Sequence, residues 1–231
     1  MGEVSVARNY KDTVFRMLFK NRKELLELYN ALNETDYQDP EALEVTTLEN
    51  AIYIGMKNDV SFLLESELNL YEQQSTYNVN MPLRDLFYVA KQLEKLTNKK
   101  DLYSSRLVKI PMPRFIVFYN GKTKRREREI LLLSNAFEKK TDEPELELKV
   151  TMLNVNSGYN RELMEKCRTL HEYSMFVGMV RHYKKRMKIE DAVNKAVDEC
   201  IKENILRDFL IAQRSEVIAM SIFEYNEEVK W

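Results

Sequence analysis

The chain has 231 residues, of which 36 are Lys or Arg and 37 are Asp or Glu, so its formal net charge is −1. This balance excludes a uniformly basic nucleic-acid-binding surface and leaves only local basic patches for such a partner. The five Gly and five Pro exclude a collagen-like or low-complexity chain. Two cysteines cannot build a disulfide framework, which favours a reducing, cytoplasmic compartment.

Apolar runs such as residues 115–118 are far shorter than the roughly 20 residues that a membrane-spanning helix needs. Residues 1–10 lack the apolar stretch of a secretory signal, so we expect no membrane partner. Only two histidines are present, which leaves little scope for histidine metal sites or histidine bases. Any catalysis is therefore expected to use carboxylates.

Apolar residues at helical spacing predict a helix over residues 12–32, followed by a polar loop around Pro40. Strand patterns cover residues 50–56, 58–64 and 67–75, with a tight turn at residues 65–66.

Asn80 is a candidate N-cap, and Pro82 occupies a first-turn position, so a helix is expected from there to about Thr97. Its apolar stripe is predicted to contain the following residues: Leu83, Leu86, Phe87, Ala90, Leu93 and Leu96.

The apolar run at residues 114–119 predicts a central strand covered on both faces, and residues 146–154 predict another strand. From residue 161 the pattern is helical, with breaks near residues 187–188 and 203–204. This order favours a mixed α/β layer over a doubly wound nucleotide-binding sheet, and neither GxGxxG nor a P-loop motif is present.

Alternation along the strand at residues 67–75 puts Leu68, Leu70, Glu72 and Gln74 on one face, which changes from apolar to polar. A core-facing Glu is costly unless a partner compensates its charge. Asp59 opens the neighbouring strand, so its carboxylate is positioned to converge with that of Glu72. One or two carboxylates suit Mg²⁺, although acidic residues at strand ends are also commonly only solvated.

Four segments together resemble the Rpn family, the bacterial recombination-promoting nucleases also described as transposases, within the PD-(D/E)XK nuclease superfamily. They are KDTVFRMLFKN (11–21), NDVSFLL (58–64), YEQQSTYNVNMPLR (71–84) and PRFIVFYNG (113–121). Residues 209–228 are similar to the end of the family's helical region.

The resemblance implies an α/β fold with an αβββαβ core and a mixed central sheet over residues 1–160. A C-terminal helical region, residues 161–231, would pack on this core. It also implies a metal-dependent DNA endonuclease that hydrolyses phosphodiester bonds in recombination, transposition or defence.

Carried over by position, the resemblance makes Asp59 and Glu72 the metal-binding carboxylates, with Gln73 offering its backbone carbonyl. The cofactor would be Mg²⁺ or Mn²⁺. Asp12 corresponds to the acidic residue on the first helix that completes the catalytic site, and Gln74 occupies the position of the motif lysine.

Gln74 carries no charge and cannot act as a general base, although it can orient water through hydrogen bonds. Lys57, Arg84 and Lys91 are candidates to supply the missing positive charge. The substitution keeps a second hypothesis open, in which the same fold is a DNA- or protein-binding module with little or no catalysis. A purely structural protein is a third possibility, and it predicts that Asp59 and Glu72 diverge or are neutralised by salt bridges.

Two basic segments, residues 121–128 and 181–188, are candidate phosphate-binding surfaces, with solvated surface as the alternative. The predicted DNA-binding residues are Arg84, Lys122, Lys124, Arg125, Arg126, Lys184 and Lys185. A homodimer is attractive because cutting both strands of a duplex requires two sites.

Overall fold

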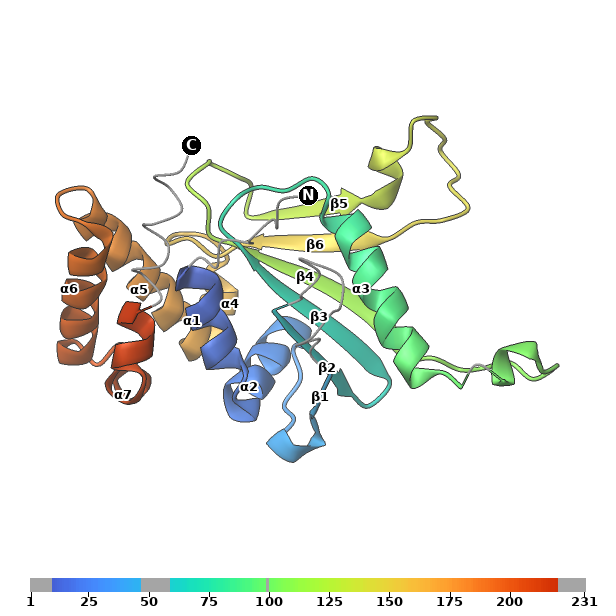
Figure 1. The fold of residues 1–231 in the computed structure, drawn as a ribbon, viewed down its shortest axis with the longest axis horizontal. Coiled ribbons are helices and arrows are strands. Elements are labelled where there is room, and N and C mark those ends of the chain that lie inside the picture. The colour runs from blue at the N-terminus through green and yellow to red at the C-terminus, as the bar shows by residue number, and fades with distance from the viewer. Residues whose placement is uncertain (1–9, 47–58, 99, 220–231) are drawn as a thin grey trace, which may run out of the picture.

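The structure is a computed structural model that describes residues 10–46, 59–98 and 100–219. A six-stranded mixed sheet with strand order β1-β2-β3-β4-β6-β5 forms its centre (Figure 1). The strands are β1 (Glu44–Val45), β2 (Val60–Leu64), β3 (Glu67–Gln74), β4 (Met112–Tyr119), β5 (Arg128–Leu132) and β6 (Lys149–Asn154). The helices are α1 (Tyr10–Phe19), α2 (Arg22–Asn33), α3 (Met81–Leu96), α4 (Arg161–Lys166), α5 (Arg168–Lys184), α6 (Ile189–Lys202) and α7 (Arg207–Ala212).

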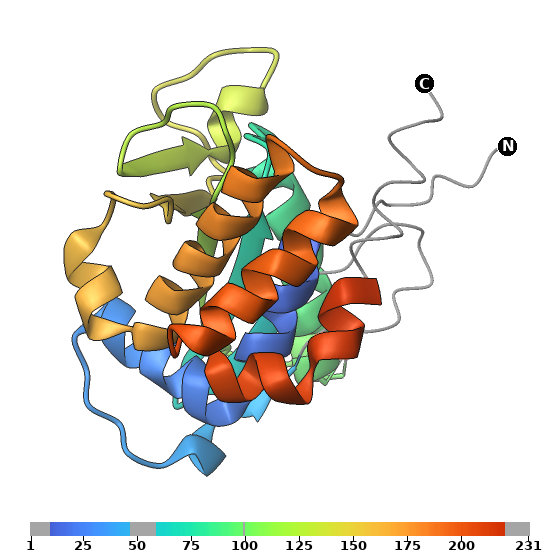
Figure 2. The same cartoon turned by 90° about the vertical axis from the view of Figure 1, so that its left-hand side faces the viewer.

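The sheet separates two hydrophobic cores. Helix α3 packs on one face against Leu68, Leu70 and Val117. The other face, which includes Tyr71 and Phe118, shares its core with α1, α2 and the helices that follow residue 160. Figure 2 shows these C-terminal helices lying over α1 and α2. The described helices of the C-terminal region therefore share one core with the sheet and pack on α1, α2 and one another, whereas a domain boundary at residue 160 stays a prediction.

Strands β3, β4 and β6 run parallel, and the remaining strand pairs are antiparallel. Gln74 is aligned with Tyr119, which is aligned with Asn154, so the three parallel strands end in one row. In open α/β sheets this carboxyl edge is the usual place for ligands.

Several predicted elements are confirmed. The turn at residues 65–66 joins β2 to β3, and Glu65 adopts a left-handed conformation there with a φ of 52°. Strand β4 is central in the sheet, and the C-terminal helices break after Lys184 and Lys202. The strand predicted at residues 50–56 lies outside the described residues.

Other predictions were wrong in detail. The helix expected over residues 12–32 is two helices, because Asn21 begins a new one by accepting a hydrogen bond from the Lys23 amide. Strand β5 was not predicted, since it is a short edge strand with a half-exposed Ile130. The strand expected at residues 146–154 begins only at Lys149.

The apolar stripe predicted for α3 was only partly right, since Leu86 and Leu93 pack on the core under this helix. Leu83 and Phe87 are 38% and 51% exposed, whereas the buried side of the helix carries the polar residues Asp85 and Gln92. Gln92 donates hydrogen bonds to the Ser61 hydroxyl and the Thr46 carbonyl, so this side of α3 faces the sheet. The helix therefore covers a partly polar stretch of the sheet, and apolar spacing did not reveal its full buried side.

A buried chain of hydrogen bonds joins β3 to α1 through the second core. The side-chain amide of Gln73 donates to Asn120 Oδ1 at 2.8 Å, and the side-chain amide of Asn120 donates to the Tyr173 hydroxyl at 2.8 Å. Tyr173 in turn donates to the backbone carbonyl of Lys11 at 3.1 Å. This chain fixes the end of β3 relative to α5 and α1.

We expect the Tyr173→Phe variant to lose about 1–3 kcal/mol of unfolding free energy, because the Asn120 amide and the Lys11 carbonyl would lose a buried partner. Urea unfolding followed by circular dichroism measures the loss. Tyr103→Phe is the matched control, since Tyr103 is 92% exposed. Equal stability of the two variants would show that the buried chain contributes nothing.

Candidate functional site

The candidate site lies where β3 changes from apolar to polar on the face covered by α3. Leu68 and Leu70 are buried there, and Glu72 follows at 2% exposure. Alternation along the strand, together with the packing of Leu68 and Leu70 under α3, puts all three side chains on that face. Glu72 is thus a buried carboxylate at the carboxyl end of a central strand, as the sequence predicted.

Asp59 lies across from Glu72 on the neighbouring strand. Val60 is opposite Tyr71, and continuing this antiparallel register by one residue puts Asp59 opposite Glu72. Directly opposite residues have Cβ atoms about 4.5–5.5 Å apart. Asp59 also shares its face with Ser61, which contacts α3, so both carboxylates lie on the same side of the sheet.

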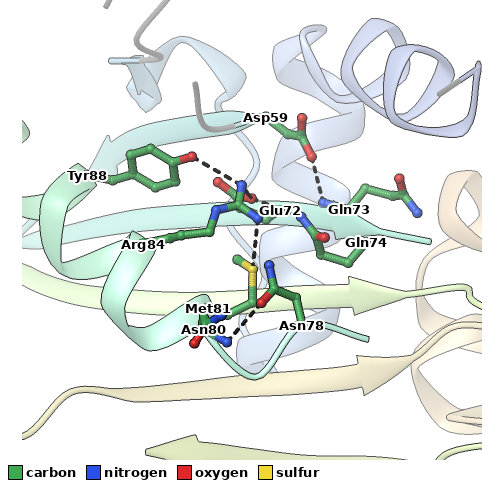
Figure 3. A network of polar contacts seen from close by, with 9 residues as sticks. All are labelled: Asp59, Glu72, Gln73, Gln74, Asn78, Asn80, Met81, Arg84 and Tyr88. Atoms are coloured by element: carbon green, nitrogen blue, oxygen red, sulfur yellow. Dashed lines mark hydrogen bonds and ion pairs between the residues drawn. The ribbon is translucent and has the colours of Figure 1, made fainter. Parts of the chain in front are cut away.

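The backbone of Gln73 faces Asp59. Its amide donates to Asp59 Oδ2 at 2.7 Å (Figure 3). The N–H and C=O of one strand residue point to the same neighbouring strand, and the Gln74 carbonyl accepts from Asn120 on the other side. The Gln73 carbonyl therefore points toward the strand that carries Asp59, and its role as a metal ligand stays a prediction.

Burial makes both carboxylates difficult to ionise. Burial raises the pKa of Asp59 to about 6. The hydrogen bond from the Gln73 backbone N–H and the charges of Arg16 and Arg84 act in the opposite direction and lower this pKa. Burial also raises the pKa of Glu72 well above its ordinary value, and the nearby charge of Asp59 raises it further. Two adjacent carboxylates in this setting need a cation when both are ionised.

Arg84 supplies a positive charge. Its Nη2 lies 3.2 Å from Glu72 Oε2 and donates to the Tyr88 hydroxyl at 3.2 Å, and its Nη1 lies 3.3 Å from the sulfur of Met81 (Figure 3). Breaking such an ion pair by removing one partner is strongly destabilising when the other is buried. Arg84, on α3, is therefore part of the site. Of the other two candidates for the missing positive charge, Lys57 lies outside the described residues and Lys91 lies two turns further along α3.

Gln74 also contacts Glu72. Its side-chain amide donates to Glu72 Oε2 at 3.3 Å, so that oxygen accepts from both Gln74 and Arg84. The other oxygen, Oε1, is buried and has no hydrogen-bond partner among the described residues. We call the group formed by Asp59, Glu72, Gln73, Gln74 and Arg84 the carboxylate site.

The donor set of the carboxylate site fits a hard divalent cation. Asp59, Glu72 Oε1 and the Gln73 carbonyl are oxygen ligands of the kind that Mg²⁺ and Mn²⁺ prefer. Within the described residues, no group of three or more His, Cys, Asp or Glu side chains is arranged to hold a metal ion. The set therefore rests on two carboxylates and one backbone carbonyl.

Asp12 lies in the first turn of α1, one turn before Arg16. Residues one turn apart share a helix side, and Arg16 is close enough to lower the pKa of Asp59. The side of α1 that carries Asp12 is thus turned toward Asp59. A third oxygen from Asp12 stays a prediction.

The sequence analysis missed Asp85, which is 2% exposed on the sheet-facing side of α3. Its Oδ1 has no hydrogen-bond partner within the described part of the chain. Burial raises the pKa of Asp85 to about 7, although the charge of Arg84 acts to lower it. The charge of Asp85 in turn raises the pKa of Glu72. Only the true orientation of α3, which its apolar pattern conceals, would have revealed this residue.

The predicted DNA-binding residues fall into three places. Arg84 is in the carboxylate site, and Arg125 lies over the Tyr77 ring at 3.3 Å from its centroid. Arg126 is an exposed residue of the same loop. The four lysines line one pocket at the carboxyl edge of the sheet: Lys122, Lys124, Lys184 and Lys185.

Comparison with family models, with curated proteins and with solved structures finds no match for this chain. The helices of the described part of the chain are all too short or too polar to cross a membrane. Fold and site therefore have to be interpreted from this chain's own residues.

We expect Asp85→Asn to stabilise the protein, and more so at pH 8 than at pH 4.5. Folding raises the pKa of Asp85 from 3.8 to about 7, so its ionisation lowers the unfolding free energy as the pH rises through this interval. One pKa unit corresponds to about 1.4 kcal/mol, so the two pH values should differ by at least about 1 kcal/mol. Urea unfolding in EDTA measures it. Asp101→Asn, at an exposed position, serves as the control, and a stabilisation independent of pH would contradict the expectation.

Proposed function

We propose that this protein is a metal-dependent DNA endonuclease with a PD-(D/E)XK-like core, acting in recombination, transposition or defence. The observation that carries the proposal is the carboxylate site, in which Asp59 and Glu72 adjoin on neighbouring strands with Arg84 beside them. The mixed sheet and the helices on both of its faces agree with an αβββαβ core, with β5 and β6 as additions.

Asp59, Glu72 and the Gln73 carbonyl would hold Mg²⁺ or Mn²⁺. When bound, the metal supplies charge that polarises a phosphodiester oxygen and lowers the pKa of bound water. Burial of the two carboxylates strengthens their hold on a cation, because little water competes with it.

Arg84 would supply the positive charge that the motif lysine, replaced here by Gln74, provides in the family. The Arg84 side chain is 35% exposed, so it contacts Glu72 and is still accessible to a phosphate. A charged donor placed at the reacting phosphate stabilises the negative charge that develops during hydrolysis. Gln74 would orient the attacking water by hydrogen bonding, but it would not accept a proton from that water.

A binding module without catalysis is the second candidate, and a specific contact favours it. Arg84 already neutralises Glu72, as a structural ion pair would, and Gln74 brings no charge. In that case the basic residues at the carboxyl edge would bind DNA while the carboxylate site only maintained the fold.

A plasmid-nicking assay in Mg²⁺ or Mn²⁺ distinguishes the two candidates. We expect cleavage by the wild-type protein and a loss of at least about 100-fold in Asp59→Asn and Glu72→Gln, the scale on which one preorganised catalytic group acts. Asp142→Asn and Glu143→Gln, two exposed loop substitutions, should cleave normally. Folded protein that binds DNA but cleaves with neither metal would favour the binding module.

Metal binding is also measurable without DNA. A ligand that binds only the folded state raises the unfolding free energy, by about 2.7 kcal/mol at 100 times its Kd. At about 2–4 °C per kcal/mol for a chain of this size, saturating Mn²⁺ should raise the Tm by several degrees. Glu72→Gln should lose this shift, whereas Glu143→Gln should keep it. A shift of the same size in both variants would place the metal elsewhere.

A further inference from the structure

A second charged site lies at the same edge of the sheet. The loop after β4, the end of β6 and the end of α5 surround a pocket of about 690 Å³. Its charged lining residues are all basic: Lys122, Lys124, Arg181, Lys184 and Lys185. The remaining lining residues carry no charge. The fold thus brings two basic segments about 60 residues apart in the sequence into one concavity, which we call the Arg181 pocket.

Arg181 anchors this pocket. Its Nη1 donates to Asn156 Oδ1 at 2.6 Å, while Nε and Nη2 are buried and find no hydrogen-bond partner within the described residues. Buried guanidinium donors without acceptors are costly. Arg181 therefore brings an incompletely compensated positive charge to the wall of the pocket, and phosphate oxygens match the planar fork of donors that an arginine presents.

Hydrogen bonds fix the walls of the pocket relative to one another. The Tyr119 hydroxyl donates to the Thr123 carbonyl at 2.8 Å, which folds the loop back over the end of β4. A Cβ at Gly121 would lie 2.2 Å from that hydroxyl oxygen, so only glycine fits there. Asn156 donates to the Gly121 carbonyl at 3.1 Å and accepts from Arg181, which joins the loop to α5.

The pocket and the carboxylate site belong to one surface. Asn154 lines the pocket and is aligned through Tyr119 with Gln74, two strands away. Strands lie about 4.8 Å apart, so this separation is roughly 10 Å. A separation of this size lies within the stretch of backbone that one bound DNA strand presents, since phosphates advance by about 3.4 Å each along the axis of B-DNA. Arg125, stacked on Tyr77, lies on the loop between them.

We propose that the Arg181 pocket binds a backbone phosphate of the DNA substrate, close to the phosphodiester bond that is cut. This inference rests on the proposed function for the identity of the anion and for the position of the cut. It names Arg181, which the sequence did not single out, as the central phosphate-binding residue.

Binding of the full-length protein to a short fluorescein-labelled DNA duplex tests the inference by fluorescence anisotropy. EDTA is present, so that no cleavage occurs. We expect Arg181→Gln to weaken binding about tenfold, as the loss of charge-assisted hydrogen bonds would. Lys184→Gln/Lys185→Gln should weaken binding and reduce the slope of log K against log salt by about 1 to 2. This double variant changes only exposed side chains, so it stays informative if Arg181→Gln fails to fold.

Lys139→Gln/Lys140→Gln is the matched control. It removes the same charge from two consecutive exposed lysines at the amino end of β6, away from the pocket. Equal effects of the two double variants, or none, would overturn the inference. Competition by inorganic phosphate that depends on Arg181, combined with unchanged DNA binding in the variants, would also overturn it, because the pocket would then hold a free anion. Pocket-dependent binding without cleavage in Mg²⁺ or Mn²⁺ would support the pocket and remove the nuclease proposal.

Discussion

The burial of Glu72 at the end of an otherwise apolar strand face is the constraint on which the site depends. A carboxylate in that position needs compensation, and every neighbouring polar group acts on it. Arg84 and Gln74 donate to one of its oxygens, while Asp59 and Asp85 raise its pKa. Helix α3 buries Asp85 and Gln92 beside the apolar Met81, Tyr88 and Val89, and leaves Leu83 and Phe87 exposed. Stability alone would favour an apolar residue at position 72, so the charge is retained at a cost that a function would explain.

The carboxyl edge of the parallel strands unites the rest of the molecule's chemistry. Strand β3 ends in the carboxylate site, and β4 and β6 end in the Arg181 pocket. Apart from Arg84, which pairs with Glu72, the basic residues that line the pocket lie apart from the carboxylate site, so a chain with a net charge of −1 carries a local basic patch.

Much of this arrangement could be predicted from sequence because it follows from strand period. Alternation placed Glu72 and Gln74 on one face, and the turn at residues 65–66 placed Asp59 beside them. The rest depends on tertiary packing. The pattern of α3 did not reveal its full buried side, so Asp85 was missed. Arg84 was one of three candidates for the missing positive charge, and its ion pair with Glu72 is also what the purely structural hypothesis predicted. Arg181 lies four residues after the buried Val177, so the two residues share a side of α5. This spacing was the one signal in the sequence that Arg181 lies on the buried side of that helix. Convergence of the two basic segments has no local signature at all.

Consecutive residues of β3 serve opposite faces of the sheet. Glu72 faces α3, while Gln73 sends its side chain to Asn120 and the buried hydrogen bonds under α5. Inserting or deleting one residue between Leu70 and Gln74 would exchange these two roles at once, because a shift of one position inverts every side chain of a strand. A deletion would bring the Gln73 side chain to the carboxylate position, whereas an insertion would bring the Glu72 acid into the aromatic core beside Tyr173. Length changes in β3 should therefore be far less tolerated during evolution than length changes in the exposed segment that leads into β4.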